Sequence, residues 1–281
     1  MSTQGFAPYP LNDGNHLPAI GFGTNALTGR EGFEAIRAAL DTGYRYLDTA
    51  VNYGNEEEVG EAVRTSGLDR EHVQVATKVP GRDHARDRAV RSVEDSLRST
   101  GLDYLDVVLI HWPNPSQGLF TEAWEALVLM RERELVRSIG VSNFTTEHLE
   151  MVSKATGVTP ALNQVELHPY FVQEQMRAAH AEQGILTQSW SPLGKGSVSF
   201  EEPAVARAAQ QHGVTPAQVI LRWHLHLGAM PLPKSANPDR QATNADVASF
   251  ELTEEQIGAI SALTRTDGRR FGGDPNTHEE M

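Results

Sequence analysis

Residues 73–111 read VQVATKVPGRDHARDRAVRSVEDSLRSTGLDYLDVVLIH, and this stretch decides the fold. It begins with a β-branched run at 73–78, continues through a segment at 89–100 whose apolar residues recur three and four positions apart, and ends in an apolar run at 105–111. These runs predict a strand, an amphipathic helix and a second buried strand. Because a helix joins them, the two strands are expected to lie parallel in one sheet.

The same alternation continues in both directions along the chain. Eight strand-like runs occur, at 19–23, 46–49, 73–78, 105–111, 138–142, 161–166, 186–190 and 229–233. Helical patterns lie between them, at 32–42, 56–66, 89–100, 119–132, 147–155 and 173–182, and two more, at 203–212 and 216–227, separate the last two strands. This repeat predicts an α/β fold, a (β/α)8 TIM barrel, with residues 1–281 forming a single domain.

Three segments fall outside the repeat. Residues 11–17 carry an Asp13-Gly14 turn between short apolar flanks, which predicts an N-terminal β-hairpin that closes the bottom of the barrel. Residues 193–199, after the seventh strand, are expected to form a long loop. Residues 267–281 are rich in glycine and charge without periodicity, and they are expected to form a tail.

The composition limits the partners of the protein. With 24 Lys and Arg against 37 Asp and Glu, the formal charge is −13, which repels nucleic acid and anionic lipid. The chain has no cysteine, which excludes disulfides and thiolate metal sites. Residues 1–4 lack the apolar core of a signal peptide, no run approaches the ~20 apolar residues of a membrane span, and no H-E-x-x-H metal motif occurs. A cytoplasmic protein that binds no metal, nucleic acid or membrane is expected.

Polar side chains stand where three successive strands end. Asp48 ends the second strand and is followed closely by Tyr53. Lys78 ends the third strand, and His111 ends the fourth. In a TIM barrel the carboxyl ends of the strands meet at one face, so these side chains are expected to converge there. Carbonyl reduction needs a proton donor and fixed positive charge near the oxygen that becomes negative, and a phenol, an ammonium and an imidazole supply them.

The four side chains are predicted to act as one electrostatic unit. A free tyrosine has a pKa near ~10, so Tyr53 donates poorly at neutral pH unless a cation such as Lys78 stabilises the phenolate. Asp48 would hold Lys78 protonated, and His111 would orient the substrate oxygen or share the proton. The structural alternative is a buried ion pair between Asp48 and Lys78, with the other two as core or rim groups. Because four complementary groups lie at the ends of three successive strands, the catalytic interpretation is favoured over the structural one.

Later strand ends carry groups that suit a nicotinamide nucleotide. Ser142, Asn143 and Gln164 offer the donors and acceptors that a carboxamide needs. Trp190 is placed to stack on the nicotinamide ring, although simple core packing is an equal alternative for an aromatic side chain there.

A basic patch follows the eighth strand. It combines cationic, hydroxyl and amide side chains: Lys234, Ser235, Asn237, Arg240 and Asn244. Arginine grips a phosphate through two parallel hydrogen bonds and lysine adds a point charge, so the patch predicts a site for a ribose 2′-phosphate. The alternative is the solvated start of a basic helix.

A glycine motif near the first strand points to another fold. Residues 21–26 read GFGTNA, which matches the G-x-G-x-x-A form of the Rossmann fingerprint, and an acid ends the next strand. A Rossmann acid would favour NAD, whereas Lys234 and Arg240 imply a 2′-phosphate far along the chain. The eight βα units therefore outweigh this short motif.

Six ordered motifs resemble the aldo-keto reductase family, above all its short bacterial branch of diketogluconate reductases. They are GYRYLDTA at 43–50, YGNE at 53–56, TK at 77–78, HWP at 111–113, GVSNF at 140–144 and NQVELHP at 163–169. The resemblance implies that Tyr53 is the general acid, that Lys78 and Asp48 tune it, and that His111 orients the substrate. It implies a monomer that uses NADPH, held by Thr24, Ser142, Asn143, Gln164, Trp190, Ser191, Leu193, Gly194, Lys234, Ser235, Asn237, Arg240 and Asn244.

The resemblance also indicates where the substrate binds. Many relatives carry aromatic side chains at the positions of Asn25 and Pro80, so this pocket is expected to be wider or more polar. Candidate substrate contacts are Phe22, Asn25 and Trp112, together with Phe120, and the tail is too short for a long specificity loop. The expected reaction is NADPH-dependent reduction of small aldehydes, dicarbonyls and keto-sugars. A non-catalytic barrel that binds the nucleotide as a sensor or scaffold, and a barrel hydrolase or isomerase, are the alternatives.

Overall fold

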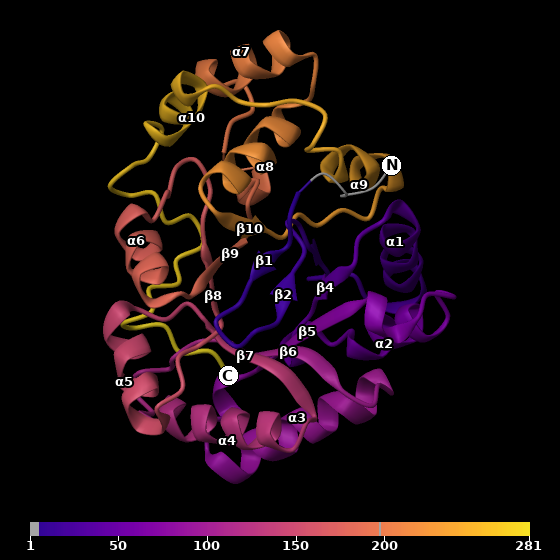
Figure 1. Cartoon of the computed structure of the whole chain (residues 1–281), viewed down its shortest axis with the longest axis vertical. Coiled ribbons are helices and arrows are strands. Elements are labelled where there is room, and N and C mark those ends of the chain that lie inside the picture. The colour runs from indigo at the N-terminus through magenta and orange to yellow at the C-terminus, as the bar shows by residue number, and fades with distance from the viewer. Residues whose placement is uncertain (1–5, 197) are drawn as a thin grey trace.

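The computed structural model describes residues 6–196 and 198–281, and it contains the predicted parallel barrel (Figure 1). The strands run in the order β10-β9-β8-β7-β6-β5-β4-β3. Their bounds are β3 Phe22–Gly23, β4 Tyr46–Asp48, β5 Gln74–Val79, β6 Leu105–Ile110, β7 Val136–Ser142, β8 Leu162–Glu166, β9 Leu186–Trp190 and β10 Ala229–Pro231. Hydrogen bonds of 3.1 Å from Gly21 N to Pro231 O and from Gly23 N to Pro233 O close the barrel. Segment 1–4 and Ser197 of the expected loop lie outside the described residues.

Helices surround the sheet and connect its strands (Figure 1). They are α1 Gly29–Thr42, α2 Glu56–Arg64, α3 Arg86–Thr100, α4 Phe120–Glu132, α5 Thr146–Thr156, α6 Glu174–Gln183, α7 Pro203–His212, α8 Pro216–His226, α9 Pro238–Ala245 and α10 Glu254–Ser261. The first eight confirm the predicted helical segments, including the pair α7 and α8 between the last two strands. Helix α9 starts within the basic patch, and α10 was not predicted.

The side chains of strand β6 belong to two hydrophobic cores, one inside the barrel and one between the barrel and the helices. All six of its residues are buried. Val107 and Leu109 belong to the cluster inside the barrel, whereas Val108 and Ile110 belong to the cluster that includes Trp124 of the surrounding helix α4. Successive side chains of a strand point to opposite faces, so a strand buried on both faces is apolar at nearly every position. Asp106 is the one charged residue of β6.

The glycines of the Rossmann-like motif serve the packing of the barrel. A Cβ atom at Gly21 would lie 2.6 Å from Leu232 Cδ2 and 2.7 Å from Tyr46 Cδ1. A Cβ atom at Gly23 would lie 3.2 Å from Leu232 O, in the segment that follows β10. A side chain at Gly21 would force Leu232 and Tyr46 to shift, and one at Gly23 would crowd the Leu232 carbonyl. The closed sheet shows that the Rossmann alternative is wrong.

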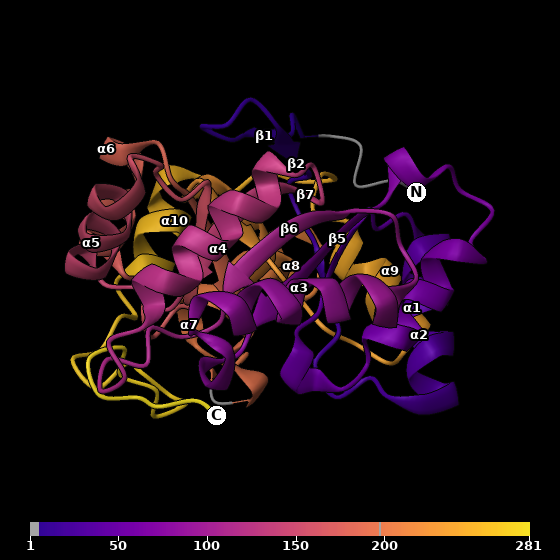
Figure 2. The ribbon, with the colours of Figure 1, turned by 90° about the horizontal axis from the view of Figure 1, so that it is seen from below.

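The predicted hairpin covers the amino-terminal ends of the strands. Strands β1 Tyr9–Pro10 and β2 His16–Leu17 pair antiparallel, and Leu11 and Leu17 join the core inside the barrel. Asn12 Nδ2 donates to Pro160 O over 2.9 Å, which ties the turn to the segment before β8. Figure 2 shows the hairpin at one end of the barrel and the carboxy-terminal tail at the other.

The tail is packed against the carboxyl ends of the strands. Residues 267–281 contain no helix or strand, as expected. However, Arg270 N donates to Glu166 Oε1 over 2.6 Å, and the Phe271 ring lies 5.3 Å from the Trp190 ring. The tail therefore reaches the face where TIM barrels carry their sites.

Candidate active site

A cavity of about 330 Å³ opens at the carboxyl ends of the strands. Its wall includes twelve residues that the sequence singled out: Asn25, Asp48, Tyr53, His111, Trp112, Ser142, Asn143, Gln164, Trp190, Ser191, Leu193 and Lys234. Gly23, Pro192, Lys195 and Leu232 also line it. Strand ends that are far apart in sequence thus supply one concave site.

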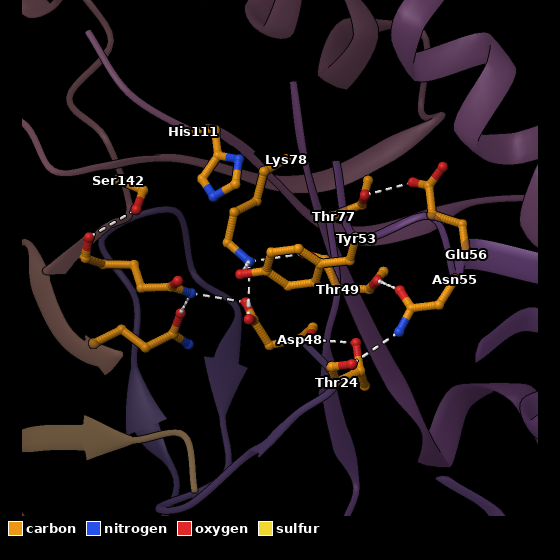
Figure 3. A network of polar contacts seen from close by, with 12 residues as sticks. Thr24, Asp48, Thr49, Tyr53, Asn55, Glu56, Thr77, Lys78, His111 and Ser142 are labelled. Atoms are coloured by element: carbon orange, nitrogen blue, oxygen red, sulfur yellow. Dashed lines mark hydrogen bonds and ion pairs between the residues drawn. The ribbon is translucent and has the colours of Figure 1, made fainter. Parts of the chain in front are cut away.

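Lys78 lies below this wall at the centre of a polar network (Figure 3). Its Nζ donates to Asp48 Oδ2 over 2.8 Å and to Thr49 O over 2.7 Å. The hydroxyl of Tyr53 lies 3.5 Å from the same Nζ. The ammonium thus has two close acceptors and a phenol within reach, and its side chain is fully buried.

Burial and charge shift the proton affinities of this network. Desolvation raises the pKa of Tyr53 above its ordinary value, Lys78 acts in the opposite direction, and Asp48 adds to the increase. For Lys78, burial alone would lower the pKa, but the charges and hydrogen bonds of Asp48 and Tyr53 outweigh burial and raise it. At neutral pH, Tyr53 therefore keeps its proton and Lys78 keeps its charge.

A short turn after β4 places Tyr53 above Lys78. The chain makes a 3-10 turn at Val51–Tyr53 that ends at Gly54 in the left-handed conformation (φ 63°). The fully buried Asn55 fixes the turn, since its Oδ1 accepts from Thr49 Oγ1 over 2.6 Å. Its Nδ2 donates to Thr24 O and Leu27 O, each over 2.8 Å. Asn55 belongs to the YGNE motif, but the sequence gives no sign of the backbone carbonyls to which its side chain donates.

Side-chain amides extend the network from Asp48 across the barrel. Gln164 Nε2 donates to Asp48 Oδ1 over 2.7 Å and to Gln188 Oε1 over 2.6 Å. Ser142 Oγ donates to Gln164 O over 2.8 Å, and Asn143 Nδ2 donates to Ser142 Oγ over 3.0 Å. These contacts hold the amide groups of Gln164 and Asn143 in the cavity wall.

Trp190 is oriented by the same network. Its Nε1 donates to Asn143 Oδ1 over 2.8 Å, so the indole is held beside the amides of the wall. The next residue, Ser191, has a positive φ of 50°, which turns the chain sharply at the end of β9. After this turn, residues 191–193 line the cavity. Their backbone and the Trp190 ring are positioned to contact a flat ligand.

His111 lies beside Tyr53 and is contacted by the tail. The two rings meet edge to face, with centroids 5.9 Å apart. Glu280 Oε1 lies 2.7 Å from His111 Nδ1, and the His278 ring lies 4.1 Å from the Trp112 ring. Sequence reasoning missed these tail residues, because an irregular segment gives no signal of where its path leads.

A second cavity, of about 550 Å³, continues from the first toward helix α9. Both cavities include Leu193 and Lys234, so an elongated ligand can extend from Tyr53 to Arg240. Lys234 and Arg240 are exposed, and within residues 6–196 and 198–281 neither side chain makes an ion pair. Two cations without counter-charges at a helix start suit a bound phosphate.

The start of helix α9 is built locally. Asn237 Oδ1 accepts from Arg240 N over 2.9 Å and caps the helix. Ser235 Oγ accepts from Asn237 N over 3.1 Å, and the buried Ser235 and Asn244 line the second cavity with Arg240. The sequence also allowed a basic helix start at this place, and the structure contains it. The basic patch lies at this helix start, beside the second cavity.

Acidic and histidine side chains also lie close together away from the cavity. His168 Nε2 and Glu166 Oε1 lie 3.0 Å apart in the interior. In the part of the chain that the structure describes, no three or more such side chains gather in a way that could hold a metal ion. Over the same ranges, no helix is long and apolar enough to cross a membrane.

A model of the aldo/keto reductase family matches residues 19–265, which covers the barrel and the cavity wall. The chain belongs to the aldo/keto reductase family. The tetrad Asp48, Tyr53, Lys78 and His111 thus lies on the barrel of a known oxidoreductase family.

This aldo/keto reductase is similar to bacterial proteins named as reductases over nearly all of its length. It is 56% identical over 271 residues to 2,5-diketo-D-gluconic acid reductase B from Corynebacterium sp. (strain SHS752001), covering 96% of this chain and 97% of that protein. It is 42% identical over 267 residues to methylglyoxal reductase DkgA from Escherichia coli (strain K12), covering 95% and 96%. The solved structure of Gox0644 matches with 42% identity, a TM-score of 0.92 and coverage of 97% and 98%. Another Gox0644 structure contains NADPH.

The structure of this reductase corrects two predicted substrate contacts. Phe22 is 1% exposed and packs against Tyr44 at 5.2 Å between ring centroids, because its position on β3 points toward the helices. Phe120 packs in the same way against Phe144, at 5.5 Å. Neither ring lines the cavity, whereas Asn25 and Trp112 do.

Two of the residues assigned to the cofactor have structural partners of their own. The hydroxyl of the buried Thr24 donates to Asp48 O over 2.9 Å, which fixes the end of β4. Gly194 is buried, and its N–H donates to Ser191 O over 2.8 Å. These contacts shape the cavity from behind its wall.

Proposed function

We propose that this aldo/keto reductase uses NADPH to reduce the carbonyl groups of aldehydes and ketones to alcohols, with Tyr53 as the general acid. One observation supports this most directly. The Tyr53 hydroxyl lies 3.5 Å from the buried Lys78 Nζ and lines the cavity, so a phenol that can donate a proton stands next to fixed positive charge.

The two connected cavities would hold a dinucleotide from end to end. Ser142, Asn143 and Gln164 would hold the carboxamide, and Trp190 would stack on the nicotinamide ring. Ser191 and Leu193 would follow the pyrophosphate, and Gly194 would support this turn from behind the wall. The 2′-phosphate and the adenine would meet the patch of Lys234, Ser235, Asn237, Arg240 and Asn244. When bound, NADPH supplies a hydride to the carbonyl carbon.

The protein's part of the reaction is the transfer of a proton. As negative charge develops on the carbonyl oxygen, the Tyr53 O–H donates its proton to that oxygen and an alcohol results. Lys78 stabilises the phenolate left behind, and Asp48 keeps Lys78 charged and fixed. His111, whose ring meets the Tyr53 ring edge to face, would orient the carbonyl oxygen.

Small, polar carbonyl compounds suit the cavity. Asn25 and Lys195 contribute polar groups, and Trp112 adds an apolar surface. The similar proteins from Corynebacterium and Escherichia coli are named for reducing a diketo sugar acid and methylglyoxal. Dicarbonyls, keto-sugars and small aldehydes are therefore the proposed substrates.

The test mixes the protein with NADPH and methylglyoxal or glyceraldehyde and follows the loss of nicotinamide absorbance. Tyr53→Phe should lower kcat by ~10² to 10⁴-fold while the Kd of NADPH, from fluorescence quenching, changes by less than about twofold. Unchanged turnover would reject Tyr53 as the acid. NADPH binding without any oxidation would favour the sensor or scaffold, and no NADPH binding would favour a hydrolase or isomerase.

A further inference from the structure

The contact between the tail and His111 goes beyond the four expected catalytic groups. Glu280 Oε1 lies 2.7 Å from His111 Nδ1, and the two side chains are only 14% and 12% exposed. His111 lines the cavity, whereas Glu280 is not among the residues of its wall. The carboxylate thus contacts the imidazole from outside the cavity wall.

The protein holds this carboxylate in place independently of His111. Asn52 Nδ2 donates to Glu280 Oε1 over 2.7 Å, and Arg82 Nη1 donates to Asn52 Oδ1, which fixes the orientation of that amide. The backbone of the same residue is fixed as well, since Asn114 Nδ2 donates to Glu280 O over 2.5 Å. The position of the carboxylate is therefore set by the loops after β4, β5 and β6.

The ring and the carboxylate present a matching donor and acceptor. In the described part of the chain, His111 Nδ1 and Glu280 Oε2 are buried polar atoms without an aligned hydrogen-bond partner. Burying polar atoms unpaired is costly, and a small rotation of the ring aligns the Nδ1 hydrogen with the carboxylate, whose Oε1 lies 2.7 Å away. Burial alone would raise the pKa of Glu280, but hydrogen bonding and charge from His111 and a hydrogen bond from Asn52 lower it below its ordinary value, so it is an anion that can only accept.

We propose that Glu280 is a positioning residue that accepts the Nδ1 hydrogen of His111 and so presents Nε2 to the substrate. A carboxylate at one ring nitrogen fixes both the orientation of an imidazole and the nitrogen that carries its hydrogen. When both ring nitrogens of His111 carry a hydrogen, the imidazolium is positively charged and the Glu280 carboxylate neutralises that charge. The Nε2–H then donates to the carbonyl oxygen of the substrate. This role rests on the proposed carbonyl reduction.

The neighbouring residue offers a matched control. Glu279 is also a tail carboxylate, but its Oε1 accepts from Ser116 N over 2.8 Å, and no contact joins it to the ring of His111. Glu280→Gln and Glu279→Gln therefore remove the same charge from adjacent positions, and only the first removes it from Nδ1 of the imidazole.

The kinetic test compares these two variants. Glu280→Gln should lower kcat for carbonyl reduction by about 10- to 100-fold with NADPH affinity unchanged, whereas Glu279→Gln should stay within about twofold of the parent. Equal effects of the two variants, or a parallel loss of NADPH affinity, would overturn the proposal. A higher kcat/KM in Glu280→Gln would also overturn it, because the tail would then obstruct the site.

A spectroscopic test needs no turnover. In ¹⁵N NMR spectra of the unaltered protein, His111 Nδ1 should carry a hydrogen, and in Glu280→Gln the neutral ring should move toward the Nε2–H form. A hydrogen only on Nε2 in the unaltered protein would contradict the contact. If the unaltered protein reduces no carbonyl compound, the proposed function fails, while these signals still decide whether Glu280 positions His111.

Discussion

Lys78 Nζ lies 2.8 Å from Asp48 Oδ2 in the barrel interior, where the two side chains are 0% and 5% exposed. Asp48→Asn removes the negative charge but leaves the ammonium buried. Because an uncompensated buried charge is costly, we expect the free energy of unfolding to fall by about 3–5 kcal/mol, measured by urea denaturation. The rate of carbonyl reduction should fall as well, since burial alone lowers the pKa of Lys78.

A second buried acid separates the stability effect from the catalytic one. Asp106 on β6 is also nearly buried and pairs with Arg70 over 2.7 Å, but it does not line the cavity. Asp106→Asn should therefore destabilise the fold with little change in kcat. If Asp48→Asn reduced carbonyls at the parental rate, Lys78 would not need its counter-charge for the reaction.

The two cations at the end of the groove should distinguish NADPH from NADH. Arg240→Ala and Lys234→Ala each remove a charge that is expected to contact the 2′-phosphate, which NADH lacks. The Kd of NADPH should rise by about 10- to 100-fold, and that of NADH should change little, in fluorescence titrations. The exposed Arg30 on α1, which contacts Glu34 and the Phe33 ring, provides the control Arg30→Ala. Equal losses for both nucleotides would rule out a 2′-phosphate site.

Periodicity predicted the barrel because parallel strands buried on both faces leave a strong signal. All eight predicted strands are present, but the first and last are shorter than expected. Strand β10 ends at Pro231, since Pro231 and Pro233 have no N–H to donate to a neighbouring strand. Helix α10 was missed although Thr253 and Gln256 form a capping box, a start signal that the sequence does contain.

The candidate site was predictable where it lies at strand ends and unpredictable where it depends on loop paths. Asp48, Lys78 and His111 sit at or next to the ends of strands, so the barrel geometry alone brings them together. Phe22 was misplaced because neighbouring positions on a short strand point to opposite faces, and the sequence did not show which face was inside. Glu280 reaches His111 through an irregular tail, and no local pattern encodes that path.

The tail also limits the space around Trp112. A Cβ atom at Gly273 would lie 2.3 Å from Trp112 Cη2, so Gly273→Ala must shift the indole or the tail that packs on it. Because Trp112 lines the cavity, the KM of bulky carbonyl substrates should change by about tenfold, and that of small aldehydes should change less. The control is Gly258→Ala on α10, where an added Cβ meets nothing within 4 Å. Identical KM values across a substrate panel would show that Trp112 does not shape the pocket.

Buried histidines make the stability of the barrel depend on pH. Burial lowers the pKa of His180 to about 4. Its ring nitrogens lie 3.0 Å from Asn163 Nδ2 and 2.8 Å from Thr187 Oγ1. A neutral ring satisfies both contacts by accepting from the amide and donating to the hydroxyl, whereas a second ring hydrogen would face the amide N–H. The folded protein therefore resists protonation at this site.

This lowered pKa sets the direction of the pH effect. The unfolded chain protonates His180 near its ordinary pKa of ~6.5, and the folded protein does so only near 4, so stability falls as the pH drops through this window. The loss amounts to roughly 3 kcal/mol, and His180→Gln should remove that part of the slope in urea denaturation between these pH values. His84 and His224, with pKa values lowered by burial to about 4 and about 3, act in the same direction, so a weaker slope remains. The exposed His16→Gln controls for loss of a surface histidine. Parallel stability curves for His180→Gln and the parent would show that the folded protein accepts this proton as readily as the unfolded chain does.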